Sequence, residues 1–280
     1  MVNDVSARTL HSDDVSPVGG SQRRVGGWSI MGDRVAVEAI CRSGLDFVGI
    51  DGQHGFFAFD GAATAIQVAN LCRVPCLVRV AAGQVDWIPR YLDAGADGIV
   101  VAMVSTAGDA RRAVALSCYQ PEGQRSYGGG KRNGVGDEAI RETDSRVPEV
   151  FAMIETAGAL HELDEIAATA GLAGLYVGPV DLGLAMGRPY PLPSDDAAWR
   201  EALGRVIRTC EEHGIRSGMF ATDGEDAREW LSFGFRDIVL SSDIALLRRA
   251  LSKHSRRARE PVTAADPLRP SVSADPYAGR

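Results

Sequence analysis

The sequence lacks the features of a membrane, secreted or nucleic-acid-binding protein. No apolar run reaches the roughly 18 residues that a membrane-spanning helix needs. The first residues include Asp4, Asp13 and Asp14 and contain no apolar core of a secretory signal. Acidic residues outnumber basic ones, giving a formal net charge of −7, whereas a nucleic-acid partner would require a basic face. We therefore expect a cytoplasmic protein that acts on a small molecule.

Metal-binding and disulfide patterns of cysteine are also missing. The five cysteines include no pair spaced as C-x-x-C, and an odd number cannot all pair within one chain. The sequence therefore predicts reduced, buried thiols. The remaining composition, 45% hydrophobic and 24% charged, is sufficient for a globular core. A length of 280 residues fits one large α/β domain or two smaller ones, and composition does not separate the two.

Short apolar runs alternate with helical patterns along the chain, which is typical of βα units and a parallel sheet. Several predicted helices end at a glycine, such as Gly44, Gly95 and Gly234, and the next apolar run follows closely. Eight such runs predict a closed (β/α)8 TIM barrel. The candidate strands are 27–30, 47–50, 76–80, 98–101, 150–154, 174–177, 216–220 and 237–240.

The predicted barrel domain covers residues 25–254. Residues 1–24, rich in Ser, Asp, Gly and Arg, are expected to form a flexible lead-in, and residues 255–280 a flexible tail. A glycine-rich segment, 119–148, interrupts the alternation after the fourth strand. Long structureless loops in compact domains are uncommon unless they are functional, so we expect this segment to cover the active-site rim.

Two carboxylates, Glu155 and Asp181, follow the fifth and sixth apolar runs. Consecutive parallel strands would bring both to the C-terminal rim of the barrel, where such folds place their chemistry. Oxygen ligands suit Mg²⁺ or Mn²⁺, and two carboxylates leave sites for water or substrate. Taken singly, Glu155 is better explained as a helix-start carboxylate and Asp181 as a turn or capping residue. Together they predict a metal site.

A histidine and an arginine are expected near the same rim. His54 stands three residues after Asp51, just beyond the second strand, where its ring can bond the carboxylate and meet a reactant. The alternative is a loop histidine that caps a helix or packs. Arg79 lies within the third apolar run, where an unpaired charge would cost several kcal/mol. Its guanidinium should therefore meet a substrate anion, a carboxylate such as Asp51 or Asp93, or both.

Four stretches in order resemble the HpcH/HpaI aldolase/citrate lyase family, in its class II pyruvate-dependent aldolase branch (2,4-dihydroxyhept-2-ene-1,7-dioate aldolase-like). They are LDFVGIDGQH at 45–54, LVRV at 77–80, IET at 154–156 and GPVDL at 178–182. The resemblance extends from about Gly26 to Arg249. It implies a TIM barrel of the phosphoenolpyruvate/pyruvate-superfamily type, with the last helix packed on a neighbouring subunit of a homo-oligomer, a hexamer or a trimer.

The resemblance also implies a role for each matching residue. Glu155 and Asp181 become ligands of Mg²⁺, Mn²⁺ or Co²⁺, His54 and Asp51 an acid–base pair, and Arg79 the cation that stabilises an enolate. Asp93 orients the site near a subunit boundary. The other substrate-binding positions are Trp28, Gln53, Met153, Gly178, Pro179 and Val180, with Arg79 and Asp181 also in contact with substrate.

On this interpretation the protein is an aldehyde-lyase that cleaves or forms 4-hydroxy-2-oxo acids. It would use a 2-oxo acid, pyruvate or one like oxaloacetate, and an aldehyde, through a metal-bound pyruvate enolate. Gln53 and Met153 stand where the family's aldolases usually carry Glu and Gln, which leaves the second substrate open. The alternatives are a malyl- or citramalyl-CoA-type lyase, a specialised biosynthetic enolate enzyme on the same barrel, or a barrel that binds 2-oxo acids without turnover.

Overall fold

The computed structural model describes residues 22–128, 147–189 and 195–260. Most of the predicted lead-in (residues 1–21), the centre of the glycine-rich segment (129–146) and residues 261–280 of the predicted tail lie outside the described residues. Contacts divide the chain into two units, Met1–Ile244 and Ala245–Arg280. The barrel belongs to the first unit, and the second contains the greater part of the last helix, which runs from Asp243 to Arg259.

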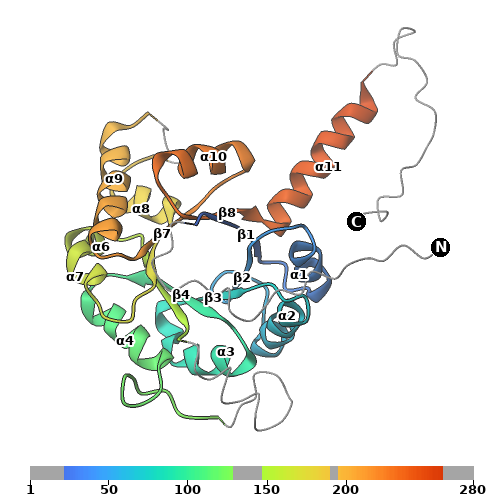
Figure 1. The fold of residues 1–280 in the computed structure, drawn as a ribbon. Helices are drawn as coiled ribbons and strands as arrows, with labels where there is room; N and C mark the ends of the chain where they lie inside the picture. Colours follow the sequence, from blue (N-terminus) through green and yellow to red (C-terminus); the bar gives the residue numbers. More distant parts are fainter. Residues whose placement is uncertain (1–21, 129–146, 190–194, 261–280) are drawn as a thin grey trace, which may run out of the picture. The chain divides into compact units, whose positions relative to one another are not determined.

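Eight parallel strands form one closed barrel, each paired with its neighbours in chain order and β8 paired with β1 (Figure 1). This confirms the predicted (β/α)8 fold and all eight predicted strands. The observed strands are longer at several ends, because backbone pairing continues beyond the apolar run. Their bounds are β1 Arg24–Ser29, β2 Phe47–Asp51, β3 Cys76–Val80, β4 Gly98–Val104, β5 Glu149–Ile154, β6 Gly174–Val177, β7 Arg216–Phe220 and β8 Asp237–Ser242.

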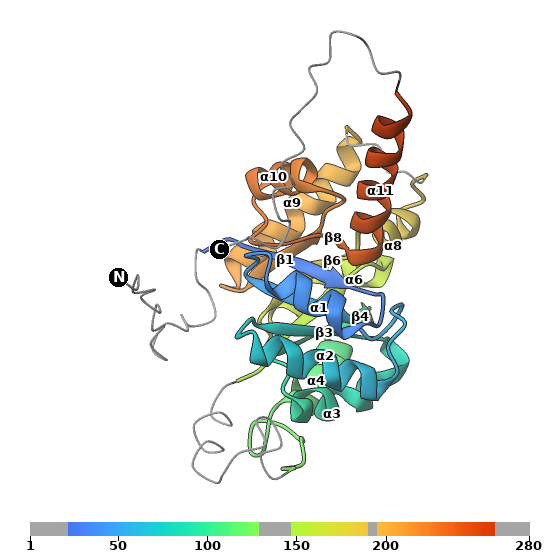
Figure 2. The ribbon, with the colours of Figure 1, turned by 90° about the vertical axis from the view of Figure 1, so that its right-hand side faces the viewer.

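Helices follow the strands and lie on the outside of the barrel, as the side view in Figure 2 shows for α1 and α2. None of the described helices has the length and apolar composition needed to span a bilayer. Their bounds are α1 Arg34–Cys41, α2 Phe59–Leu71, the 3-10 helix η1 Ala82–Trp87, α3 Ile88–Ala94, α4 Ala107–Ser117, α6 Ala157–His161, α7 Leu163–Ala167, α8 Pro179–Ala185, α9 Ala197–Glu212, α10 Gly224–Phe233 and α11 Asp243–Arg259.

Local sequence sets where these helices begin and end. Thr106 forms a capping box with Asp109 at the start of α4, which satisfies backbone N–H groups that have no partner within the helix. Asp223 accepts hydrogen bonds from two N–H groups of α10 in the same way. Gly95 closes α3 with a φ of 109°, a conformation that a side chain would strain. Caps and glycines thus return the chain to each successive strand.

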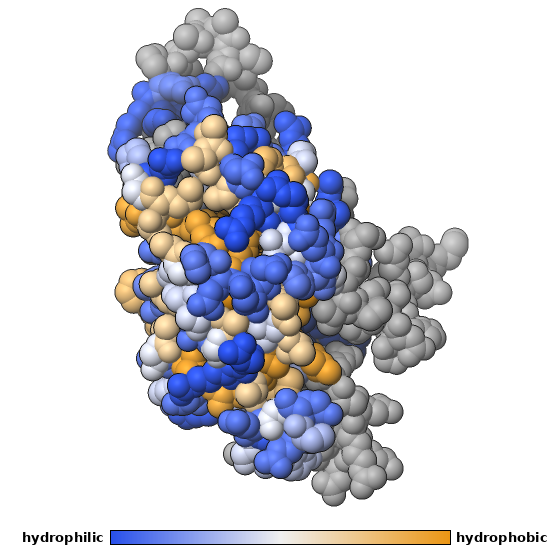
Figure 3. Space-filling view, turned by 90° about the vertical axis from the view of Figure 1, so that its left-hand side faces the viewer, coloured by the Kyte–Doolittle hydropathy of each residue, from blue (hydrophilic) through white to orange (hydrophobic). Residues whose placement is uncertain are grey.

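Apolar side chains form two separate cores. The larger one fills the layer between the barrel and its helices. The smaller one fills the barrel interior and includes Trp28, Phe47, Phe151, Met153 and Tyr176. Figure 3 shows hydrophilic residues interspersed with apolar ones on the surface around α6, α7 and α9. The barrel interior is therefore a packed core, and the chemistry of such a fold takes place at the C-terminal end of the barrel.

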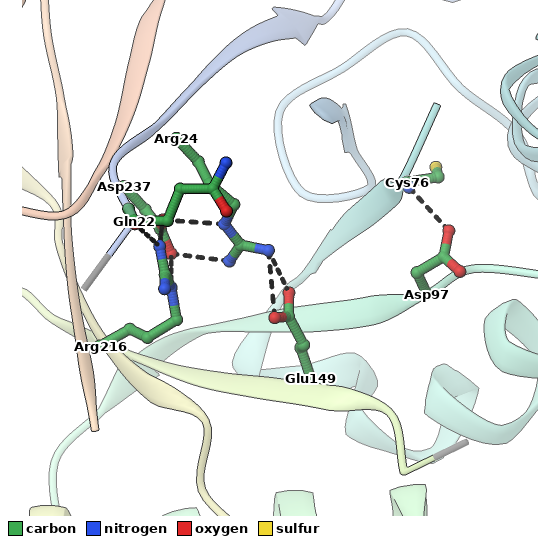
Figure 4. Close-up of polar contacts among 7 residues, drawn as sticks. All are labelled: Gln22, Arg24, Cys76, Asp97, Glu149, Arg216 and Asp237. Atoms are coloured by element: carbon green, nitrogen blue, oxygen red, sulfur yellow. Dashed lines mark hydrogen bonds and ion pairs between the residues drawn. The ribbon is translucent and has the colours of Figure 1, made fainter. Parts of the chain in front are cut away.

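Buried charges close the N-terminal end of the barrel (Figure 4). Arg24 on β1 binds both carboxylate oxygens of Asp237 on β8, at 2.7 and 2.9 Å, and reaches Glu149 on β5 at 3.0 Å. Arg216 on β7 also binds Asp237, with an Nε–Oδ2 distance of 2.8 Å, and donates to the backbone oxygen of Gln22. This ion network ties four strands together at the end opposite the rim.

The glycine-rich segment joins α4 to β5. Its described start folds back on the end of α4, where Gln124 N–H donates to the Ala115 oxygen and Arg125 N–H to the Cys118 oxygen. Its described end leads into Glu149, at the N-terminal end of β5. Both ends therefore lie at the opposite end of the barrel from the rim that we expected the segment to cover, because α4 has already carried the chain back from that rim. Residues 129–146 lie outside the described residues.

We expect Asp237→Asn to lower the free energy of unfolding by about 3–5 kcal/mol, since it leaves two buried guanidinium groups without their shared carboxylate. Burial alone would raise the pKa of Asp237, but hydrogen bonds and charges from Arg216 and Arg24 hold it below its ordinary value. The stabilisation is therefore present above about pH 4 and is lost as the pH falls through the folded-state pKa. Urea denaturation as a function of pH measures both effects.

The matched control is Asp86→Asn. Asp86 forms an ion pair with Arg112 at 2.9 Å, but both side chains are largely exposed, so the loss should be less than about 1 kcal/mol. Equal losses in the two variants would contradict a structural role for the ion network.

Candidate functional site

The candidate site lies at the C-terminal ends of strands β2, β3, β5 and β6. Side chains alternate along a strand, and Phe151 and Met153 of β5 point into the barrel. Glu155, two residues further, continues this inward-facing row and is buried. Asp181 lies in the first turn of α8, directly after β6, and is exposed. Arg79 comes from β3 and Asp51 from β2, where the two residues are register partners.

Asp51 and Arg79 form a buried ion pair through both carboxylate oxygens. The Arg79 guanidinium also lies 5.7 Å from the centroid of the Trp28 ring and 5.9 Å from that of Phe220. Trp28 in turn donates its indole N–H to Asp51 at 3.2 Å. The carboxylate and the aromatic rings fix the guanidinium on two sides, so its position is set before any substrate arrives.

Asp51 is saturated with hydrogen bonds. Besides Arg79 and Trp28, it accepts the backbone N–H groups of Gln53 at 3.0 Å and His54 at 2.9 Å. Burial alone would raise the pKa of Asp51, but the hydrogen bond and charge of Arg79 hold it below the ordinary aspartate value. Asp51 is therefore ionised near neutral pH, and its negative charge is matched by Arg79.

Glu155 is held by an unusual backbone feature of β4. The register between β4 and β5 shifts between Val101 and Val104, and Met103 within this bulge has a φ of 57°. The bulge turns the Met103 N–H toward Glu155, whose Oε1 accepts it at 2.5 Å. The other oxygen, Oε2, lies against Gly178, where a Cβ would overlap it. One oxygen is thus fixed and the other is directed toward the start of α8.

The electrostatic environment of Glu155 suits a cation. Burial raises the pKa of Glu155, and the nearby Asp181 carboxylate raises it further, which together outweigh the Met103 hydrogen bond and the charge of Arg79. A divalent cation would relieve the repulsion between the two carboxylates, and both offer the oxygen donors that Mg²⁺ and Mn²⁺ prefer. The donor set therefore fits such an ion. Within residues 22–128, 147–189 and 195–260, no group of three or more His, Cys, Asp or Glu residues could hold a metal.

The structure brings together most of the residues that the sequence singled out. Trp28, Asp51 and Arg79 lie in contact, and the charges of Arg79 and Asp181 act on Glu155. Met153 is buried in the barrel interior beside Gly178. Val180 is exposed next to Asp181.

His54 and Asp93 do not make the contacts that the sequence suggested. His54 is exposed, and its bond to Asp51 is made by the backbone N–H rather than by the ring, because the Asp51 oxygens already have other donors. Asp93 lies near the end of α3 and pairs with Arg125 at 2.7 Å. The structure therefore does not bring Asp93 to the rim residues of its own chain.

Sequence reasoning missed two contributors, Met103 and Phe220. Met103 acts through its backbone, and no residue pattern predicts a left-handed methionine in a strand. Phe220 ends β7 and packs edge-on against Trp28, with ring centroids 4.8 Å apart. Its position at the end of a predicted strand could have indicated that it lies at the rim. Asp243 accepts the Ser29 hydroxyl at 2.7 Å and the N–H groups of Ile30 and Met31, which fixes the end of β1 beside Trp28.

The comparisons with known proteins agree with this geometry. Residues 24–250 match the family described as HpcH/HpaI aldolase/citrate lyase. A hydroxypyruvate/pyruvate aldolase of Rhizorhabdus wittichii is 31% identical over 224 residues, 80% of this chain and 89% of that protein. A solved family member from Burkholderia cenocepacia superposes with a TM-score of 0.79 at 28% identity, covering 87% of this chain and 97% of that one. The citrate synthase SbnG gives 0.75 at 27% identity, with 85% and 93% covered.

A closed (β/α)8 barrel with an arginine and carboxylates gathered at its C-terminal rim defines a barrel enzyme. The chain belongs to the HpcH/HpaI aldolase/citrate lyase family, and it is a lyase. The family predicted from the four sequence stretches is thereby confirmed.

We expect Glu155→Gln to raise the free energy of unfolding of the cation-free protein by on the order of 1 kcal/mol, since it removes a poorly compensated buried charge. The amide oxygen of glutamine can still accept the Met103 N–H. Because the pKa of Glu155 is raised in the folded state, the difference between variant and wild type should shrink as the pH falls and Glu155 becomes protonated. Denaturant unfolding in a chelator measures this, and a less stable variant at neutral pH would contradict it.

Proposed function

We propose that the protein is a divalent-metal-dependent aldolase that forms or cleaves a 4-hydroxy-2-oxo acid. In the forming direction, pyruvate loses a proton from C3, the resulting enolate carbon bonds to the carbonyl carbon of an aldehyde, and the aldehyde oxygen takes up a proton. The observation that carries the proposal is the buried Glu155, held by Met103 N–H, with Asp181 and Arg79 close enough to act on its charge. The family membership and the aldolase relatives support the same reaction class.

Glu155 and Asp181 would hold the cation, Mg²⁺ or Mn²⁺. When bound, the cation supplies a Lewis acid that favours the enolate form of the 2-oxo acid. Arg79 supplies a second positive charge that is always present and already oriented by Asp51. Asp51 itself is too fully hydrogen-bonded to act as a base, so we assign it the role of positioning Arg79.

His54 is the proposed proton carrier. Its ring is exposed at the rim and is not fixed by Asp51, and an imidazole can both accept and donate a proton near neutral pH. The start of α8 is the proposed binding position for the substrate carboxylate. Gly178, its N-cap residue, provides no side-chain cap, so the N–H groups around Val180 and Asp181 are left to meet an anion.

The second substrate is the open part of the proposal. Met153 is buried beneath the site, and Gln53 carries no charge, so neither can act as an acid or a base toward it. The similarity in fold to the citrate synthase SbnG, at 27% identity, favours one further candidate, a synthase in which an enolate attacks the ketone carbon of a 2-oxo acid instead of an aldehyde. Product analysis with pyruvate and a panel of aldehydes and 2-oxo acids distinguishes the two reactions.

The first test is exchange of the C3 protons of pyruvate with deuterium oxide, followed by NMR without any aldehyde. Exchange should require Mg²⁺ or Mn²⁺, and it should fall at least about 100-fold in Glu155→Gln and Asp181→Asn, the scale of losing one major stabilising group. In the wild type, cation at about 100 times its dissociation constant should add about 2.7 kcal/mol to the unfolding free energy.

Glu165→Gln is the matched control, because it makes the same chemical change on the exposed surface of α7. It should leave exchange and cation-dependent stability unchanged. Exchange that persists in Glu155→Gln, or in excess chelator, would refute the proposed metal site.

A second prediction concerns Arg79→Lys. Lysine keeps the positive charge but cannot bind Asp51 through a planar two-nitrogen fork. The side-chain charge at position 79 would therefore no longer be held in one place. We expect the exchange rate to fall by about 100-fold with little change in the affinity for Mg²⁺ or Mn²⁺. The exposed Arg112→Lys serves as the control, and a normal rate in Arg79→Lys would remove Arg79 from the proposed chemistry.

A further inference from the structure

A groove lies beside the candidate site, between α9 and α10 and beyond the end of β7. Its volume is about 980 Å³, and pockets of 300–1,000 Å³ are typical of small-molecule sites. The largely buried side chains of Trp199, Met219 and Trp230 contribute the apolar part of its lining. No step of the proposed enolate chemistry uses this space.

The groove borders the rim. Pro179 and Val180, which line it, directly precede the proposed metal ligand Asp181. Phe220 lines it from the other side, and the same ring lies 5.9 Å from the Arg79 guanidinium. A molecule whose reactive end sits at the rim therefore has this groove as an outlet for the rest of its chain.

Most of the charged side chains on the groove walls are negative. Four lining side chains are carboxylates and one is an arginine, Arg228. Of the carboxylates, Asp223 and Asp226 accept backbone N–H groups, and Glu229 pairs with Arg200 at 3.2 Å. Glu225 is exposed and has no ion-pair partner in the part of the chain that the structure describes. The walls therefore repel an anion entering the groove.

The start of α10 does not offset this repulsion. A helix N-terminus ordinarily attracts an anion through its free N–H groups. Here Asp223 already takes the N–H groups of Glu225 and Asp226, at 3.0 Å each, and Asp226 takes that of Thr222 at 2.7 Å. A carboxylated ligand would find these donors occupied by carboxylates of the protein itself.

We infer that this groove holds the chain of the acceptor aldehyde and that it selects an uncharged aldehyde over a carboxylated one. This inference rests on the proposed aldolase function. The new bond joins C3 of pyruvate to the aldehyde carbonyl carbon at the rim, and the aldehyde oxygen takes up a proton there. The groove contributes only binding, through apolar contact with the chain and repulsion of a terminal carboxylate.

The first experiment compares kcat/KM for butanal and 4-oxobutanoate, two four-carbon aldehydes that differ by a terminal carboxylate. The wild type should prefer butanal. In Glu225→Lys the preference should move toward 4-oxobutanoate by about fivefold. The effect is moderate because the reversed charge acts on the ligand carboxylate across several ångströms of solvent. Glu212→Lys, the same charge reversal at the exposed end of α9, should leave the ratio unchanged.

The second experiment tests the space itself. Thr222→Trp would place a bulky ring in the groove, so kcat/KM for hexanal should fall by at least about tenfold, the scale of losing two or more apolar contacts. The value for acetaldehyde, which is too short to reach beyond the rim, should change much less. This length dependence separates filling of the groove from general damage to the fold.

Deuterium exchange into pyruvate, measured without aldehyde in each preparation, reports the enolate chemistry independently of the groove. The inference is overturned if the wild type prefers 4-oxobutanoate, or if neither Glu225→Lys nor Thr222→Trp changes aldehyde preference while wild-type exchange is normal. In those cases the proposed function still stands. Absence of exchange in the wild type would instead overturn the proposed function, and this inference with it.

Discussion

The Arg79 guanidinium is the positive charge on which the arrangement of the rim depends. It is largely but not fully buried in the barrel mouth, paired with Asp51 and placed against the rings of Trp28 and Phe220. A buried charge without a partner is strongly unfavourable, so Asp51 must remain ionised and in place. Asp51 in turn fixes the loop that carries Gln53 and His54 by accepting their N–H groups. One ion pair thereby positions side chains from two strands and the following loop.

The two ends of the barrel use buried charge differently. At the N-terminal end, Arg24, Arg216, Asp237 and Glu149 satisfy one another and tie strands together. At the C-terminal end, Glu155 has one oxygen fixed by the Met103 N–H and the other directed toward the start of α8, and the Asp181 carboxylate is near, so negative charge is left over. An imbalance of this kind is unfavourable for folding but favourable for binding a cation. The division between a stable end and a reactive end is typical of (β/α)8 barrels.

Much of the architecture could be read from the sequence, because it depends on local patterns. The eight apolar runs, most of them followed by a helical pattern with a recognisable cap or glycine, were sufficient to predict the closed barrel. Glu155, Asp181, Arg79 and Asp51 could be singled out because each stands in or just after a strand. The exception was the glycine-rich segment, whose composition indicated a functional loop. Its described ends lie at the opposite end of the barrel from the rim, because the segment begins after helix α4 and leads into the start of strand β5.

The sequence by itself determined the residue types, the barrel topology and the rim to which the strand-end side chains belong. Only the tertiary structure decided which groups are in contact. It gave the carboxylate of Asp51 to Arg79 and Trp28 rather than to the His54 ring, and it turned a backbone N–H of Met103 onto Glu155 through a bulge in β4. Strand-forming runs and helix caps are encoded within a few residues, whereas the contacts of Asp51 with Trp28 and Arg79 and of Glu155 with Met103 join positions 23 to 52 residues apart and depend on how the closed barrel aligns its strands.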